Sequence, residues 1–266
     1  MNKKRFTTII TTVLAAGVFC LTGCSQSGAD LLGQVKEKGE LVVAMEGIWA
    51  PWTFHDENDT LVGFDVEVSQ KLAEKLGVKA SFVEGDWDGL FAGLDSKRYD
   101  IVCNGVEITD ERAEKYDFSE PYAYIHTAII VRGDNDTIHS FEDLKDKQTA
   151  NTLSSTYAAL AESYGATAIG VEALDQTLDL VLAGRVDATL NADLSFYDYM
   201  KVHPDADLKI VALTEDASEI AIPVRKGKES TAFLNAVNKA IAELRESGDL
   251  GQISTKYFDV DISNKE

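Results

Sequence analysis

Apolar residues recur along the chain in two alternating patterns, short continuous runs and stripes with helical spacing. The run at 41–44 predicts a buried strand, and the stripe of Val68, Leu72 and Leu76 predicts a helix that Asp65 caps. The same alternation then predicts a hairpin around 54–62, a strand at 80–83, a helix from Trp87 to Leu94 and a strand at 101–103. Alternating strands and helices of this kind favour an α/β architecture.

A second series of the same kind fills the rest of the chain. Strands are expected at 128–131, 149–153, 188–190, 208–213 and 219–224, and helices at 157–165, 174–182, 233–248 and 250–257. Two such series within 266 residues predict two lobes. The pattern alone does not decide which lobe the last helices join.

The first residues carry the features of a secretory signal. Three basic residues at 3–5 precede an uncharged stretch at 6–21, and the segment ends Leu21-Thr22-Gly23-Cys24. This ending looks like a bacterial lipobox with Cys24 as the lipidated residue; a transmembrane helix is the alternative interpretation. We therefore expect a lipoprotein signal peptide at 1–23 and a tether at 24–34. Two acyl chains on Cys24 would hold the protein at the outer face of the cytoplasmic membrane, the periplasmic side in a Gram-negative cell.

The composition is strongly acidic, with 45 Asp and Glu against 25 Lys and Arg and a formal net charge of −20. A nucleic-acid-binding protein needs a basic surface, and no basic run beyond the first residues supplies one, so nucleic acid is excluded as a partner. Cys103 is the cysteine that remains after Cys20 and Cys24. It lies in an apolar run, which predicts a core residue without a disulfide.

The residue patterns of common catalytic and cofactor sites are missing from the sequence. The four histidines are scattered, and no HExxH, P-loop, GxGxxG, CxxC or GxSxG motif occurs. We therefore expect no metal, no cofactor and no catalytic residues, and a binding function gains weight.

The most informative run extends from Thr109 to Tyr122. Thr109 is expected to cap a short helix, which places Arg112 in the first turn. A cation there is unfavourable for the helix dipole, and a bound anion would compensate. Arg112 is therefore either a carboxylate-binding residue, a task for which arginine is well suited, or one half of a surface ion pair.

The mature chain resembles the family-3 extracellular solute-binding proteins of amino-acid ABC importers. The motifs that carry the resemblance are Gly63-Phe64-Asp65-Val66-Glu67, Trp87-Asp88-Gly89-Leu90, Arg98-Tyr99-Asp100, Thr109-x-x-Arg112, Phe118-Ser119-x-Pro121-Tyr122 and Gly184-Arg185-Val186-Asp187-Ala188. Weaker cues, among them Asn151-Thr152-Leu153-Ser154-Ser155, are similar to cystine-binding and other polar amino-acid-binding members.

The resemblance implies a type II periplasmic-binding-protein fold, an α/β fold with two lobes joined by two hinge strands. Lobe 1 would cover residues 35–130 and 220–262, and lobe 2 would cover 131–219. The hinge strands would lie near 128–131 and 216–221. The ligand would bind in the cleft, and the lobes would close on it.

The resemblance also implies roles for individual residues. Arg112 matches the residue that binds the ligand α-carboxylate, and Gly105 matches a backbone partner beside the ligand. Ser155 and Thr156 match a turn at a helix N-terminus in lobe 2, whose N–H groups complete carboxylate binding.

Further positions match the walls of the site. Trp49 and Trp87 match aromatic positions that stack around the ligand, for which core packing is the alternative. Glu46 matches an acidic position that often meets a ligand side chain or amine.

The sequence departs from the family pattern at two positions. Glu107 stands where Ser or Thr is usual, and Ala192 stands where an Asp usually pairs with the ligand ammonium, with Asp193 one residue away. We expect Glu107 to replace the missing carboxylate. Together with Glu46 and Asp193, it would favour a ligand with a second cationic group.

These observations predict a monomeric, lipid-anchored binding protein that captures an amino acid and delivers it to an ABC permease. The ligand class is polar, with cystine-like and cationic amino acids as candidates. Two alternatives stay open, an enzyme of the dehydratase type on the same scaffold and a sensory domain without transport.

Overall fold

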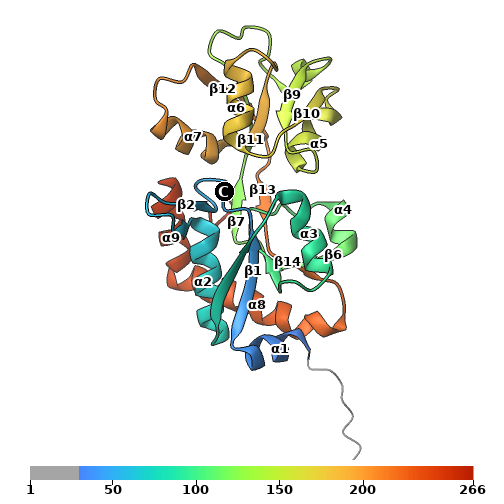
Figure 1. Cartoon of the computed structure of the whole chain (residues 1–266), viewed down its shortest axis with the longest axis vertical. Coiled ribbons are helices and arrows are strands. Elements are labelled where there is room, and N and C mark those ends of the chain that lie inside the picture. Colours follow the sequence, from blue (N-terminus) through green and yellow to red (C-terminus); the bar gives the residue numbers. More distant parts are fainter. Residues whose placement is uncertain (1–29, 266) are drawn as a thin grey trace, which may run out of the picture.

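The computed structural model describes residues 30–265, so the predicted signal peptide and lipidated Cys24 lie outside the described residues. Figure 1 shows two α/β bodies stacked along the long axis and joined by β7 (Ala123–Ile125) and β13 (Ser218–Ile220), which pair antiparallel. We call the body with the first and last helices lobe 1, and the other lobe 2. No helix in this part of the chain is long and apolar enough to cross a membrane.

Lobe 1 is built from both ends of the described chain. Its elements are α1 (Leu31–Lys38), β1 (Glu40–Met45), β2 (Phe54–His55), β3 (Leu61–Val62), α2 (Phe64–Leu76), β4 (Lys79–Glu84), α3 (Trp87–Asp95), β5 (Ile101–Val102), α4 (Asp110–Lys115), β6 (Tyr116–Phe118), β14 (Pro223–Arg225), η2 (Lys228–Ser230), α8 (Thr231–Ser247) and α9 (Asp249–Phe258). The helices α8 and α9 contact α2, which settles that the C-terminal helices join lobe 1.

From Leu41 to Met45, strand β1 is apolar because both faces of its sheet are covered. It lies between β4 and β5 in a parallel sheet. Leu41, Val43 and Met45 point into the core that α2, α8 and α9 complete, whereas Val42 and Ala44 pack with α3 on the opposite face. A continuous apolar run is what a strand buried on both faces requires.

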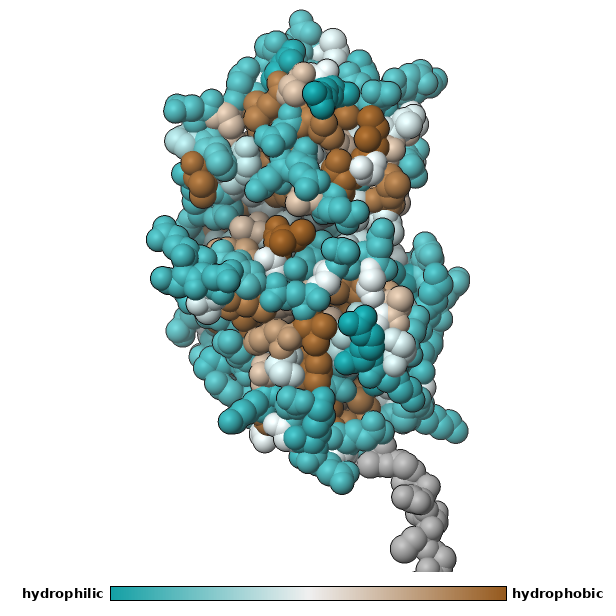
Figure 2. All heavy atoms as spheres, in the orientation of Figure 1, coloured by the Kyte–Doolittle hydropathy of each residue, from teal (hydrophilic) through white to brown (hydrophobic). Residues whose placement is uncertain are grey.

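Lobe 2 comprises a single internal stretch of the chain. Its elements are β8 (Thr127–Arg132), η1 (Phe141–Leu144), β9 (Gln148–Asn151), α5 (Thr156–Ser163), β10 (Thr167–Gly170), α6 (Leu174–Leu182), β11 (Thr189–Ala192), α7 (Asp193–Val202) and β12 (Leu208–Leu213). Strand β8 is the centre of an antiparallel sheet with the order β11-β8-β12, and β9 pairs in parallel with β10. Figure 2 shows that hydrophilic residues cover much of the visible face of both lobes.

The boundaries differ from the sequence expectation in two places. Strand β8 includes the whole predicted hinge segment 128–131, so the chain has already entered lobe 2 at Thr127. Helix α1 begins inside the predicted tether 24–34, and its Leu31 is 2% exposed. In both places the apolar pattern was visible in the sequence, but the pattern does not say which body a segment packs against.

The sequence predicted that Asp65 caps α2. This prediction is wrong, because the N-cap residue is Gly63. The Asp65 side chain is instead completely buried, and it accepts hydrogen bonds from the Gly105 N–H at 2.6 Å and the Tyr122 hydroxyl at 2.8 Å. Burial raises the pKa of Asp65 to about 7, and these two hydrogen bonds oppose that rise. Asp65 thus ties the loop after β5 to the core of lobe 1.

Replacing Asp65 by Ala should destabilise the protein by about 2–4 kcal/mol, because two buried donors lose their acceptor. Tyr122→Phe removes one donor together with its hydrogen bond, so it should lower the free energy of unfolding by less, about 1 kcal/mol. Urea unfolding of the three proteins at one pH measures both effects. Equal losses for the two variants would contradict the assigned role of the Asp65 carboxyl group.

Candidate functional site

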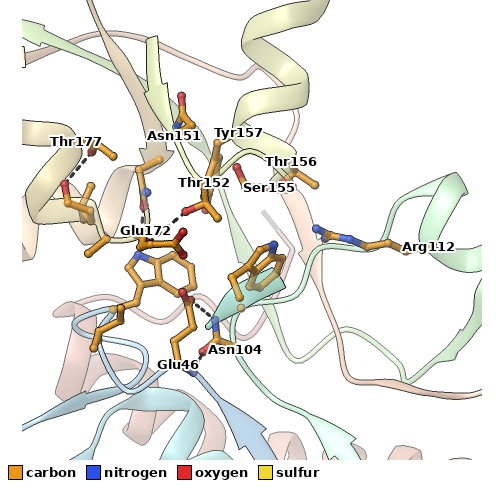
Figure 3. Close-up of a pocket in the computed structure, with 17 residues that line it drawn as sticks. Glu46, Asn104, Arg112, Asn151, Thr152, Ser155, Thr156, Tyr157, Glu172 and Thr177 are labelled. Carbon is orange, nitrogen blue, oxygen red and sulfur yellow. Dashed lines mark hydrogen bonds between the residues drawn. The ribbon is translucent and has the colours of Figure 1, made fainter. Parts of the chain in front are cut away.

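A cavity lies between the two lobes, a position that small-molecule sites often occupy. Both lobes line it, as Figure 3 shows, with the residues Glu46, Ile48, Trp49, Trp87, Asn104, Gly105 and Arg112 from lobe 1 and Asn151, Thr152, Ser155, Thr156, Tyr157, Glu172, Ala173, Leu174, Thr177 and Asn191 from lobe 2.

Direct contacts hold the lobes together around this cavity. The indole N–H of Trp49 donates to Asn191 Oδ1 at 3.2 Å. The indole N–H of Trp52 donates to Ser195 Oγ at 3.1 Å. At the rim, Lys201 Nζ lies 2.6 Å from Asp259 Oδ2. The structure therefore represents a closed arrangement of the two lobes.

One end of the cavity is cationic. Thr109 caps α4 as predicted, accepting a hydrogen bond from the Arg112 N–H at 3.2 Å. The Arg112 guanidinium lies over the rings of Trp87 and Phe91, at 5.3 and 5.5 Å, and donates to the Glu107 carbonyl oxygen at 3.0 Å. Burial lowers the pKa of Arg112 from its ordinary value. Because α4 has six residues, Arg112 is as close to its last turn as to its first, and the predicted dipole conflict loses its force.

The N-terminus of α5 lies at the same end of the cavity. Ser155 caps this helix and accepts a hydrogen bond from the Ala158 N–H at 3.1 Å. The first N–H groups of a helix have no partner inside the helix, and Thr156 and Tyr157 at this position line the cavity. Arg112 and the N-terminus of α5 together form a cavity end with positive electrostatic character that spans both lobes.

The other end is acidic. Glu46, which follows β1, accepts a hydrogen bond from Asn104 Nδ2 at 2.7 Å, and Glu172 lies across from it on lobe 2 (Figure 3). Burial raises the pKa of Glu46 to about 7; the charge of Glu172 adds to this rise, while the Asn104 hydrogen bond opposes it. None of the ion pairs found within residues 30–265 includes Glu46 or Glu172.

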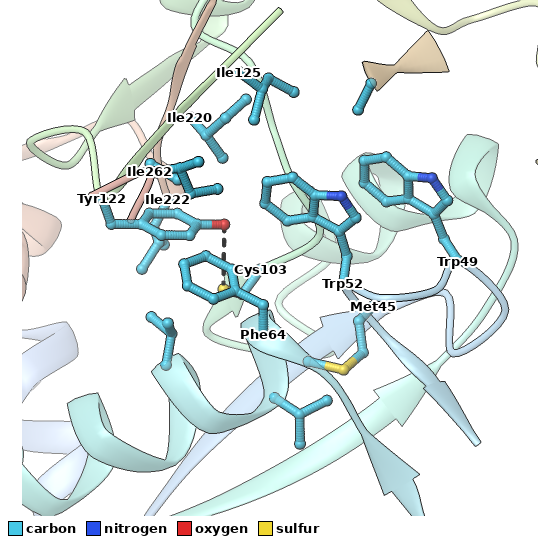
Figure 4. Close-up of a cluster of buried hydrophobic side chains, with 14 of the residues drawn as sticks. Met45, Trp49, Trp52, Phe64, Cys103, Tyr122, Ile125, Ile220, Ile222 and Ile262 are labelled. Carbon is cyan, nitrogen blue, oxygen red and sulfur yellow. Dashed lines mark hydrogen bonds between the residues drawn. The ribbon is translucent and has the colours of Figure 1, made fainter. Parts of the chain in front are cut away.

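Trp49 lines the cavity, and a second, fully buried indole packs behind it. Trp49 stacks on Trp52 with ring centroids 5.1 Å apart, and Figure 4 shows this pair above the core that includes Phe64. Trp49 also covers Gly105, where an added Cβ would lie 2.5 Å from the ring. Gly105 has φ of +56°, so both its backbone and this close contact require glycine.

The cavity brings together seven of the nine residues predicted from the sequence, namely Glu46, Trp49, Trp87, Gly105, Arg112, Ser155 and Thr156. Glu107 and Asp193 do not line it. The Glu107 side chain is 8% exposed and lies beside Arg112, Thr156 and Ser218. Asp193 begins α7, and its carboxylate accepts a hydrogen bond from the Leu194 N–H.

Sequence reasoning gave no role to several residues of the cavity, above all Asn104, Asn151, Glu172 and Asn191. Asn151 ends β9, and Asn191 is the penultimate residue of the neighbouring strand β11, which runs parallel to β9. The carboxyl ends of such strands form ligand sites, so this position was a usable signal. Glu172 lies in a loop, where no pattern distinguished it.

The comparison with known proteins places this architecture in a family. The model of the bacterial extracellular solute-binding proteins, family 3, matches residues 41–260. The chain belongs to this family. The resemblance inferred from its motifs and the expected two-lobed fold are thereby confirmed.

Three relatives of this family-3 protein are named for the amino acids cystine or arginine. The chain is 42% identical over 235 residues to the L-cystine-binding protein of Bacillus subtilis, covering 88% of this chain and 87% of the relative. An ancestral arginine-binding protein bound to arginine is 37% identical with a TM-score of 0.77, covering 83% of this chain and 98% of that one. The unliganded open L-cystine receptor of Neisseria gonorrhoeae is 38% identical, covering 89% and 100%, but its TM-score is 0.62.

Carboxyl NMR titration of Glu46 checks the electrostatics of the acidic end. In the closed, ligand-free protein Glu46 should titrate near pH 7. Glu172→Gln should lower that pKa, because it removes a like charge, and Asn104→Ala should raise it, because it removes a hydrogen bond to the charged form. A Glu46 pKa near 4 in all three proteins would contradict this description.

Proposed function

We propose that the chain captures an amino acid in its interlobe cavity and delivers it to an ABC permease. The observation that carries this proposal is the polarity of the cavity. Arg112 and the N-terminus of α5 lie at one end, whereas Glu46 and Glu172 lie at the other. A ligand with a carboxylate and a separate cationic group satisfies both ends, which an anion or a neutral sugar does not.

The carboxylate of the ligand is assigned to the cationic end. A guanidinium binds a carboxylate through two parallel N–H groups, and the N–H groups of Thr156 and Tyr157 approach from the other lobe. Because the two sets of donors belong to different lobes, a carboxylate between them stabilises the closed arrangement. The Trp87 ring beside Arg112 excludes water from this contact and strengthens it.

The acidic end indicates the class of amino acid. The α-carboxylate and the α-ammonium of a ligand are bonded to one carbon, whereas Arg112 and Glu46 lie on different sides of the cavity in Figure 3. Glu46 and Glu172 therefore fit a second, distal cation better than the α-ammonium. Cystine and the basic amino acids both carry such a group, and relatives that are named for cystine and arginine support this class.

A thermal-shift screen of the twenty amino acids with cystine and ornithine tests the proposal. A true ligand at 100 times its dissociation constant should stabilise the protein by about 2.7 kcal/mol. Arg112→Ala should abolish the shift, since losing one partner of a buried charge pair costs about 2–5 kcal/mol. Glu172→Gln should weaken ligands with a distal cation and leave neutral amino acids unaffected. Recovery of chemically altered ligand would instead indicate an enzyme, and no shift with any compound would refute the proposal.

We further propose that the protein is held at the membrane through lipidated Cys24. The support is the sequence of the signal segment, which ends Leu21-Thr22-Gly23-Cys24. In cells, Cys24→Ser should move the protein from the membrane fraction to the soluble exported fraction, while Cys103→Ser, a change in the core, should leave it in the membrane fraction. Equal membrane retention of both variants would contradict the anchor.

A further inference from the structure

Glu107 is a buried carboxyl group at the junction of the two lobes, and the ligand cavity described above does not use it. Its side chain is 8% exposed, and its Oε1 is buried with no hydrogen-bond partner in the described part of the chain. An oxygen in this situation is costly for a charged carboxylate and much less costly for a neutral one.

The backbone around Glu107 is fixed to the segment that joins the lobes. Glu107 forms a β-bridge with Ile220, the last residue of β13, and the Ile108 N–H donates to the Glu219 carbonyl at 2.9 Å. The position of the Glu107 carboxyl group relative to lobe 1 is therefore set by the hinge, and lobe 2 covers it when the lobes meet.

Four side chains face the Glu107 carboxyl group. Thr156 and Tyr157 come from α5 of lobe 2, Ser218 comes from β13, and Arg112 comes from α4. Arg112 is the cation among these four side chains. The hydroxyl groups and Arg112 favour the charged form, but burial outweighs them and raises the pKa of Glu107 above its ordinary value.

Glu107 and the ligand compete for the same guanidinium. If the ligand carboxylate pairs with Arg112, as the proposed function requires, a charged Glu107 beside it would repel the ligand and lose its own counter-charge. We propose that Glu107 is a positioning residue which must be uncharged for the lobes to close on the ligand, so that binding is accompanied by uptake of a proton at its carboxyl group. This inference rests on the proposed function.

The sign of the pH dependence follows from the two states. An open form that exposes Glu107 to water removes the burial that raises its pKa, so closure raises the pKa. Closure is therefore favoured fully below the open-state pKa and loses this contribution as the pH rises through the closed-state pKa. Affinity should fall by up to about tenfold for each pH unit within that interval. Glu46 also titrates in the closed cleft, so its contribution has to be separated from that of Glu107.

Isothermal titration calorimetry of the unmodified protein with its best amino-acid ligand tests the inference. Measurements in two buffers of different ionisation enthalpy, repeated from about pH 5 to pH 8, give the number of protons taken up. Glu107→Gln keeps a neutral side chain of the same shape, so it should bind well, with weaker pH dependence than the wild type and less proton uptake. Because Glu46 contributes equally to both proteins, the difference between them isolates Glu107.

Glu114→Gln is the control, since Glu114 is an exposed carboxylate on α4, the helix that carries Arg112, and it should behave as the wild type. Equal proton uptake by the wild type and Glu107→Gln would overturn the inference. It is also overturned if Glu107→Gln folds but loses binding at every pH as Arg112→Ala does, because the charge of Glu107 would then contact the ligand. If no amino acid binds the wild type at any pH, the result refutes the proposed function itself, and the inference about Glu107 falls with it.

Discussion

The closing of two lobes over charged groups is the constraint on which the rest of this structure depends. The closed cleft buries Arg112, Glu46 and Glu107, and burial shifts the pKa of each toward the neutral form. Burying a charge is unfavourable unless a partner of opposite sign accompanies it. A ligand that carries both signs would supply those partners, so the proposed function couples ligand binding to lobe closure.

Closure also depends on a rigid floor for the cavity. The buried carboxyl of Asp65 accepts the Gly105 N–H, which holds the loop after β5 in place. Trp49 covers that loop and reaches across the cleft to Asn191 in lobe 2. The same indole therefore packs on the scaffold of lobe 1 and contacts lobe 2. Trp49 is buried and also lines the cavity, so core packing does not exclude ligand contact, which stays a prediction.

Much of the fold could be predicted because local patterns survive in it. The apolar run of β1 and the stripe of α2 specify their elements, and Thr109 caps α4 because its hydroxyl meets a free N–H three residues on. The boundaries between the two lobes were harder to predict from the sequence. An apolar strand such as β8 has the same pattern in a hinge and in the centre of a sheet, and Asp65 looks the same whether it caps a helix or lies buried within its first turn.

The sequence by itself determined the class of the protein, its two α/β series and the cationic end of its site. These features rest on residues close together in the chain, such as the run from Thr109 to Tyr122. Only the tertiary structure decided which carboxylates share the cavity. It brings Glu172 opposite Glu46 and leaves Glu107 and Asp193 outside, because lobe closure joins loops that lie far apart in the sequence. Each end takes residues from both lobes, so the complete site is a property of the closed form.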